Sequence, residues 1–217
     1  MNILVTRSAQ GIGKAIAELF LREGHTVFGI DRNEASICHK NYQHFVLDVR
    51  EIEKMPEIPP IHILINNAGT QNEDDIAINL NALIDVTEKY GIHENIFSVL
   101  NIGSASGHTG AEFPLYSASK GGVIAYTKNV AMRIAKFGAT CNSLDPGGVL
   151  TPLNDPVVYD PVLWEEIMGE TPLKRWATAE EIAEWAYFLT VKNRFCTGQS
   201  IIVDGGESIN YHFVWKD

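Results

Sequence analysis

Short apolar runs alternate with stretches of helical period along the whole chain. The runs are apolar almost throughout, as expected for parallel strands that helices cover on both faces. They predict strands at residues 3–6, 26–30, 44–47, 62–66, 96–102, 139–145 and 200–204. The helical patterns predict helices from Ile12 to a cap at Gly24, and at about residues 76–90, 116–137 and 179–190. Residues 51–60 carry three prolines and predict a loop or one broken turn. This order predicts a single α/β domain over residues 1–217, a doubly wound, Rossmann-type parallel sheet of about seven strands.

Composition and charge narrow the classes of function. The chain has 217 residues, 45% of them hydrophobic, which suits one domain with a sizeable core. Its 17 basic and 27 acidic residues give a formal charge of −10, so we expect neither nucleic acid nor membrane as a partner. No run approaches the ~20 apolar residues that span a bilayer, and the apolar start before Arg7 is too short for a signal peptide. We therefore expect a cytoplasmic protein.

The three cysteines, Cys38, Cys141 and Cys196, lie far apart and lack the spacing of metal ligands. We expect reduced, buried thiols and no metal site.

The stretch Thr6 to Gly13, "TRSAQGIG", joins the first predicted strand to the first predicted helix. Gly11 and Gly13 open a helix whose first turn has no acidic side chain, so its N–H groups and dipole favour an anion such as a pyrophosphate. An ordinary tight turn would have a similar sequence, and Arg7 stands where such loops usually open with glycine. A second signal is Asp31, directly after the second strand, where a carboxylate can accept hydrogen bonds from both ribose hydroxyls of an adenosine. The sequence "DRN" at residues 31–33 is also typical of a solvent-exposed turn.

Further motifs follow at the ends of the predicted strands and in the helices. In chain order they are DV (48–49), NNAG (66–69), INLNA (78–82), NIGSASG (101–107), YSASK (116–120) and NSLDPGGVLTP (142–152). With TRSAQGIG, they resemble the short-chain dehydrogenase/reductase family, in its single-domain NAD(P)-dependent subgroup, over essentially the whole chain. The resemblance implies an oxidoreductase that transfers a hydride between a nicotinamide cofactor and a secondary alcohol or ketone.

The resemblance also implies the residues of the site. It assigns catalysis to Asn79, Ser104, Tyr116 and Lys120, with Asn81 as the fallback for Asn79 because the chain between Gly69 and Asn79 is short for the family. Besides Tyr116 and Lys120, the cofactor-binding residues that it implies are Arg7, Gln10, Gly11, Ile12, Gly13, Asp31, Asp48, Val49, Asn67, Ala68, Gly69, Pro146, Gly147, Val149 and Thr151.

Tyr116 and Lys120 are four residues apart in a helical pattern and so share a face. A free tyrosine titrates near ~10, and we expect the Lys120 ammonium, together with a positively charged nicotinamide ring, to lower the pKa of Tyr116 toward neutrality. Tyr116 would then exchange a proton with the substrate oxygen, and Ser104 would donate a hydrogen bond to that oxygen. The resemblance implies that Lys120 also holds the nicotinamide ribose and that Asn79 positions a water that links Lys120 to solvent.

In the family, the segment that corresponds to residues 153–176 closes over cofactor and substrate, so we expect a lid there. Trp164 and Met168 either line one face of a lid helix or pack against the domain. His108 either touches substrate or lies in a solvated loop. The apolar tail residues Phe213, Val214 and Trp215 favour burial between chains, and relatives commonly associate, so we expect a homotetramer or homodimer.

Two other functions share this fold. A dinucleotide-sensing regulator without turnover tends to lose the catalytic tyrosine or lysine, and this chain keeps both. An epimerase or dehydratase of nucleotide sugars usually carries a larger C-terminal substrate domain, for which 217 residues leave no room.

We expect NAD rather than NADP as the cofactor. The Asp31 carboxylate would repel the 2′-phosphate of NADP, and Gln10, where NADP-preferring relatives often have a basic residue, is neutral. Arg7 and Arg32 argue for NADP, because an arginine fork binds phosphate well. We interpret Arg7 as paired with Asp31, stacked on adenine or turned to solvent, and as a source of strain in a turn that usually begins with glycine.

Overall fold

A computed structural model describes residues 1–71, 74–111 and 113–210. Its centre is a seven-stranded sheet in the order β3-β2-β1-β4-β5-β6-β9, in which every neighbouring pair is parallel. The strands are β1 (Asn2–Thr6), β2 (Thr26–Asp31), β3 (Tyr42–Val46), β4 (Ile63–Asn66), β5 (Ser98–Ile102), β6 (Thr140–Pro146) and β9 (Ser200–Val203). The predicted fold class and strand number are therefore confirmed.

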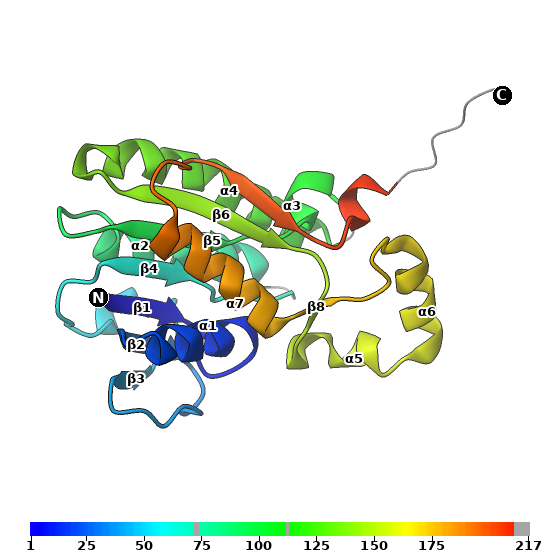
Figure 1. The fold of residues 1–217 in the computed structure, drawn as a ribbon, viewed down its shortest axis with the longest axis horizontal. Coiled ribbons are helices and arrows are strands. Elements are labelled where there is room, and N and C mark those ends of the chain that lie inside the picture. Colours follow the sequence, from blue (N-terminus) through cyan, green and yellow to red (C-terminus); the bar gives the residue numbers. More distant parts are fainter. Residues whose placement is uncertain (72–73, 112, 211–217) are drawn as a thin grey trace.

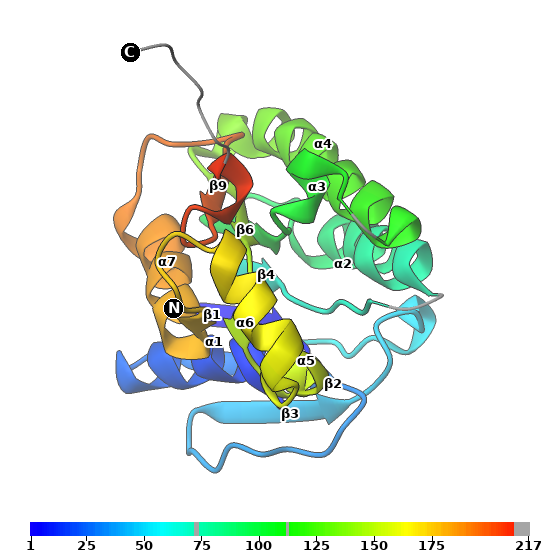
Figure 2. The same ribbon diagram turned by 90° about the vertical axis from the view of Figure 1, so that its right-hand side faces the viewer.

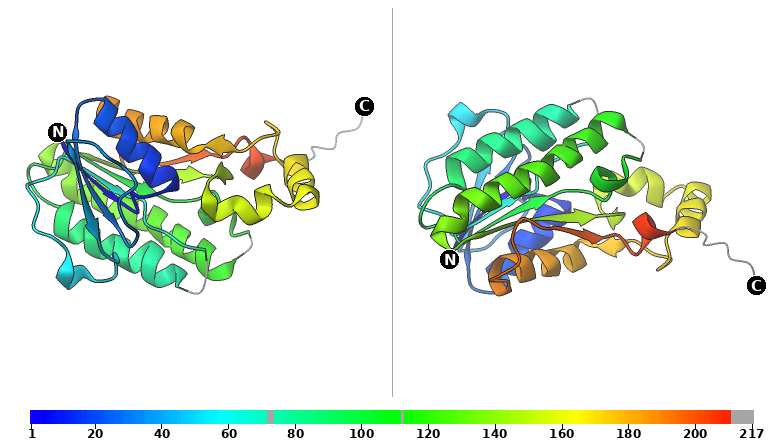
Figure 3. Two further views of the ribbon diagram at one scale, coloured as in Figure 1. Left: turned by 90° about the horizontal axis from the view of Figure 1, so that it is seen from below. Right: turned by 90° about the horizontal axis from the view of Figure 1, so that it is seen from above.

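Helices cover both faces of the sheet, as the apolar strands require (Figure 1; Figure 3). One face carries α1 (Gly11–Arg22) and α7 (Ala179–Tyr187), which pack together over a core that includes Ile3, Phe20 and Ile182. The other face carries α2 (Leu83–Tyr90) and α4 (Pro114–Ile134) over a core that includes Leu4, Val99 and Ile134.

Several short elements extend or interrupt this plan. Two π-helices occur, η2 (Ile76–Ala82) before α2 and η5 (Phe188–Lys192) after α7, and 3-10 turns are formed by η1 (Ile52–Lys54), η3 (Ala135–Phe137), η4 (Pro152–Asn154) and η6 (Glu207–Ile209). Within residues 51–60 the only helical turn is η1, which confirms the predicted broken turn. The helices α3 (Ser106–Thr109) and α5 (Asp155–Val158) were not predicted, whereas α6 (Pro161–Glu170) contains Trp164 and Met168 and agrees with the lid helix that was one of the two alternatives for these residues. A two-stranded sheet of β7 (Val149–Leu150) and β8 (Ala177–Thr178) was not predicted either.

The carboxyl ends of the strands meet at one edge of the sheet, and α5 and α6 stand beyond that edge, in front of the sheet in Figure 2. In open parallel sheets this edge is where ligands bind. None of the helices in the described ranges is long and apolar enough to cross a membrane. Cys141 is buried as expected, whereas Cys38 is exposed, because it lies in the loop between β2 and β3 rather than in the core.

Candidate active site

The loop between β1 and α1 is shaped by two left-handed residues. Arg7 has φ 54° and Gly11 has φ 55°. This conformation costs an L-residue such as Arg7 about 1–2 kcal/mol, so the expected strain in the turn is present. Gly13 is required for a different reason, because a Cβ there would collide with the carbonyl oxygen of Arg7 and with Nδ2 of Asn67.

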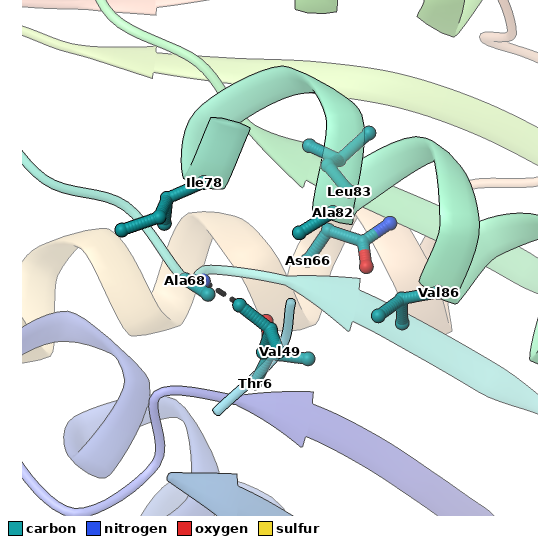
Figure 4. A pocket seen from close by; sticks show the side chains of 8 residues that line it. All are labelled: Thr6, Val49, Asn66, Ala68, Ile78, Ala82, Leu83 and Val86. Atoms are coloured by element: carbon teal, nitrogen blue, oxygen red, sulfur yellow. Dashed lines mark hydrogen bonds between the residues drawn. The ribbon is translucent and has the colours of Figure 1, made fainter. Parts of the chain in front are cut away.

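Asn67 holds this loop in place. Its Nδ2 donates to the carbonyl oxygens of Thr6 at 3.1 Å and Arg7 at 3.2 Å. The backbone N–H groups of Asn67 and Ala68 both donate to the Thr6 Oγ1 at 2.9 Å, the second bond being visible in Figure 4. The side-chain donor of Asn67 therefore supports the loop, and its part in cofactor binding stays a prediction.

A groove of about 740 Å³, including space open to solvent, runs from this loop along the carboxyl edge of the sheet. Seven of the predicted cofactor residues line it, namely Arg7, Gln10, Asp31, Asp48, Val49, Ala68 and Gly69, together with Ile30, Arg32, Asn33, Leu47, Thr70, Ile78 and Leu153. A small depression, which is too small to hold a water molecule, adjoins it and shares Val49, Ala68 and Ile78 with it (Figure 4). The structure thus brings together residues from four strand ends that the sequence could only align one by one.

The remaining predicted cofactor residues do not line this groove. Ile12 is partly buried and packs against the core of the α1 face. Gly11 lies close to Thr151, whose Cγ2 is 3.4 Å from the position of a Cβ on Gly11. Pro146, Gly147 and Val149 lie at the end of β6 and in β7, and the Pro146 carbonyl accepts a hydrogen bond of 2.9 Å from the Ala105 N–H.

Asp31 is almost fully buried, with 3% of its surface exposed. Its Oδ2 accepts from the Ala9 N–H and its Oδ1 from the Asn33 N–H, both at 2.9 Å. A carboxylate has about four acceptor positions, so these two bonds leave room for ribose hydroxyls. Nearby Asp48 forms a two-pronged ion pair with Arg50, which lowers the pKa of Asp48 and neutralises its charge.

No ion pair joins Arg7 to Asp31 within the part of the chain that the structure describes, which corrects one of the predicted arrangements. Arg7 is not turned fully to solvent either, because it is partly buried. Burial lowers the pKa of Arg7, and the charge of Asp31 opposes that effect.

Ser104, Tyr116 and Lys120 meet beside this groove. Ser104 follows β5 directly and is hydrogen-bonded to the Tyr116 side chain. Lys120 lies one turn further along α4, with its Nζ 5.7 Å from the centre of the Tyr116 ring. The same Nζ donates to the Ile102 carbonyl at 2.8 Å, and only 5% of Lys120 is exposed.

Asn79 joins this group from the π-helix η2. It is fully buried, its Oδ1 accepts from the Thr70 N–H at 2.8 Å, and its Nδ2 donates to the Thr70 carbonyl at 2.9 Å. Asn79 Oδ1 and Lys120 Nζ both lie within 3.5 Å of the position that a Cβ on Gly69 would take, so they approach the same point. Asn81, the fallback, is exposed and takes no part in this arrangement.

The pKa values of Tyr116 and Lys120 both depart from those of the free side chains. Burial raises the pKa of Tyr116, an effect that the hydrogen bond from Ser104 and the charge of Arg7 only partly oppose. Burial also lowers the pKa of Lys120 to about 8. In the protein alone the pKa of Tyr116 is therefore raised, because the phenolate loses solvation on burial. That a positively charged nicotinamide ring together with Lys120 lowers it stays a prediction.

Asp75, Asp145 and Ser143 also belong to this neighbourhood, and none of them was predicted as a site residue. Asp75 is 3% exposed, and its charge raises the pKa of both Tyr116 and Lys120. His108, for which two places were open, binds Asp145 instead: its Nε2 lies 2.6 Å from Oδ2 of that fully buried carboxylate. Ser143 also hydrogen-bonds Asp145. The position of Asp145 directly before Pro146 was the only signal in the sequence.

The predicted lid corresponds to η4, α5 and α6. Leu153 of η4 lines the groove, which brings the start of this segment to the site. Trp164 packs edge-on against Trp176 at 5.1 Å between ring centres, so it contacts the junction with the domain. Phe213, Val214 and Trp215 lie outside the described residues.

Comparison with known proteins agrees with this geometry. Residues 7–208 match the family described as enoyl-(acyl carrier protein) reductase. The chain is 33% identical to a 3-oxoacyl-(acyl-carrier-protein) reductase of Buchnera aphidicola, over 94% of this chain and 95% of the relative. It is also 33% identical to dehydrogenase/reductase SDR family member 6 of Rattus norvegicus, over 95% of this chain and 97% of the relative. A crystal structure of a putative 2-deoxy-D-gluconate 3-dehydrogenase from Agrobacterium tumefaciens with bound NADP is similar with a TM-score of 0.87 and 25% identity, over 96% of each chain. The chain therefore belongs to the short-chain dehydrogenase/reductase family of oxidoreductases.

Proposed function

We propose that the protein transfers a hydride between NAD(P) and a secondary alcohol or ketone, with Tyr116 as the group that exchanges the proton. The observation that carries the proposal is the hydrogen-bonded Ser104–Tyr116 pair above the buried Lys120, beside a groove of the size and composition that a dinucleotide needs. Membership of the family supports an oxidoreductase that uses NAD(P).

The groove residues fit a dinucleotide. The N-terminus of α1 has no acidic side chain in its first turn, and a partly buried arginine, Arg7, lines the groove beside it. Asp31 has the place and the free acceptor positions for the adenosine ribose, so we propose a preference for NAD over NADP. When bound, the nicotinamide supplies or accepts the hydride.

The chain's own residues handle the oxygen of the substrate. Tyr116 gives its proton to the carbonyl oxygen during reduction and takes it back during oxidation, while Ser104 donates a hydrogen bond to the same oxygen. Burial disfavours the phenolate, so oxidation needs positive charge near Tyr116, to which Arg7 contributes. Asn79, which is hydrogen-bonded to Thr70, provides polar atoms near the Lys120 Nζ. It positions a water that links Lys120 to solvent.

The relatives' names support small keto or hydroxy compounds as substrates. One relative is named for a 3-oxoacyl thioester and another for a keto sugar acid. The test is a panel of ketones and secondary alcohols from these classes, with NADH, NADPH and their oxidised forms, followed by absorbance at 340 nm. Turnover of at least one member supports an oxidoreductase. Cofactor binding with no turnover of any member would favour the sensor function instead.

We also propose that the protein forms a homotetramer. Large apolar side chains are exposed on the outer helices, among them Met132 on α4 at 80% and Phe188 after α7 at 52%. A monomer would leave these groups in water, whereas pairing through α2 and α4 would cover those on α4.

A further inference from the structure

Arg7 is held in a conformation that glycine adopts more easily. Its φ is 54°, its N–H donates to the Ile30 carbonyl at 2.6 Å, and its carbonyl accepts from Nδ2 of Asn67 at 3.2 Å. These two bonds fix the backbone on both sides of the Cα, so the side chain leaves the loop from a fixed point at the groove.

The guanidinium of Arg7 has no acidic partner in the described ranges. No carboxylate there lies within 4.0 Å of it. Among these residues, Asp31, whose charge acts on it most strongly, forms no ion pair with it and accepts hydrogen bonds from the backbone N–H groups of Ala9 and Asn33. A partly buried cation without a counter-ion gains from an anion that enters the same space.

The place of Arg7 along the groove indicates which anion. Arg7 lines the groove together with Asp31 and Arg32, in the loop that leads into the N-terminus of α1, and the charge of Tyr116 also acts on it. In the proposed function, the adenosine ribose lies at Asp31 and the nicotinamide at Tyr116. The diphosphate joins these two halves of the cofactor and must cross the region between them, beside the N-terminus of α1.

We propose that Arg7 is a ligand of the diphosphate bridge of the dinucleotide, adding a charged contact to the backbone N–H groups of the loop. The inference rests on the proposed function, because it needs a dinucleotide in the groove. It explains how an arginine can replace the glycine of the turn: the charged contact offsets the strain of its backbone. Arg32, which is exposed and lies at the adenosine end, is the nearer cation for a 2′-phosphate.

The test is the affinity of a series of fragments, measured by isothermal titration calorimetry. The probes are adenosine, AMP, ADP and 2′,5′-ADP, titrated into the wild type, Arg7→Gln, Arg7→Gly and Arg32→Gln. Arg22→Gln is the matched control, since Arg22 is an exposed arginine in the last turn of α1. Circular dichroism checks that each variant is folded, and Arg7→Gly keeps the test valid if glutamine is poorly tolerated at positive φ.

Both Arg7 variants should bind ADP at least ~10-fold more weakly than the wild type, the order expected for a lost charge-assisted hydrogen bond. Adenosine should change by less than about twofold, and Arg22→Gln should match the wild type. The affinity of the Arg7 variants for ADP should also depend less steeply on salt.

Three results would overturn the inference while leaving the nucleotide site intact. Equal losses for adenosine and ADP would mean that Arg7 stacks on adenine. A loss confined to 2′,5′-ADP would make Arg7 a ligand of the 2′-phosphate, and unchanged ADP affinity would remove it from the site. If the wild type bound none of the probes, the proposed function itself would fail together with the inference.

Discussion

Replacing Lys120 by methionine should stabilise the fold while it abolishes turnover. The Lys120 side chain is 5% exposed, and burial lowers its pKa from 10.5 to about 8. Methionine has a similar length and no charge, so Lys120→Met removes the buried ammonium but keeps most of the packing.

The size of the effect follows from linkage. At about 1.4 kcal/mol per pKa unit, the difference between 10.5 and about 8 corresponds to a cost of roughly 3 kcal/mol for holding the charged form in the folded protein. The substitution also removes the hydrogen bond from the charged Nζ to the Ile102 carbonyl, worth about 1.5–3 kcal/mol. We therefore expect the free energy of unfolding at pH 7 to rise by about 0.5–2 kcal/mol.

The pH dependence gives a sharper check. Below pH 8, lysine is charged in both the folded and the unfolded protein, so the wild type bears the full cost. Between about pH 8 and 10.5 the unfolded state binds more protons, and this group makes the wild type more stable as the pH rises. The advantage of Lys120→Met should therefore be greatest near neutral pH and shrink toward pH 10.

Urea unfolding followed by tryptophan fluorescence at pH 7, 8.5 and 10 measures this difference. Lys128→Met is the matched control, since Lys128 is exposed on the same helix, and it should change stability by less than about 0.5 kcal/mol. The reasoning would be refuted if Lys120→Met were less stable than the wild type at pH 7, or if its advantage did not fall with rising pH.

Three other predictions concern cofactor, loop and assembly. Asp31→Ala should raise the ratio of kcat/KM with NADPH to that with NADH by at least ~10-fold, because the Asp31 carboxylate and the 2′-phosphate are like charges, and two unit charges about 4 Å apart repel each other by about 4 kcal/mol at an effective dielectric constant of 20. A wild type that already prefers NADPH tenfold would contradict this. Gly13→Ala should lower the free energy of unfolding by about 2–3 kcal/mol, because the new Cβ collides with Arg7 and Asn67. The control Gly110→Ala has φ 67° but open space around it, so it should lower the free energy of unfolding by only about 1 kcal/mol. Equal losses for the two variants in urea unfolding would disprove the collision. Light scattering at micromolar concentration should give the mass of a tetramer, and a monomeric mass would exclude one.

Much of the fold could be predicted because the strands are buried on both faces. A run such as Ile63–Asn66, buried at every position, carries an apolar signal that does not depend on its neighbours in space. By contrast, α6 has no buried residue, so it lacks the apolar stripe from which a helix is recognised. The π-helix η2 was predicted as an ordinary helix because seven residues are too few to separate a period of 4.4 from one of 3.6.

In the site, motif spacing predicted which side chains meet but not their energetics. Tyr116 and Lys120 share a helix face in any α-helix, so their proximity follows from the sequence. The rise in the pKa of Tyr116 depends on how deeply both side chains are buried, which only the packed structure determines. The contact of His108 with Asp145 joins residues that are 37 positions apart in the sequence, so no local sequence pattern predicts it.

In the proposed reaction, Tyr116 exchanges the proton while the nicotinamide exchanges the hydride. A comparison of the wild type with Tyr116→Phe tests this central claim most directly. The measurement pairs the Kd for NADH, from quenching of tryptophan fluorescence, with kcat for a ketone that the wild type reduces. We predict an unchanged Kd, within about twofold, and a kcat at least ~10²-fold lower, as expected when a general acid is lost. A variant that binds NADH normally and still reduces the ketone at close to the wild-type rate would contradict the assignment of Tyr116.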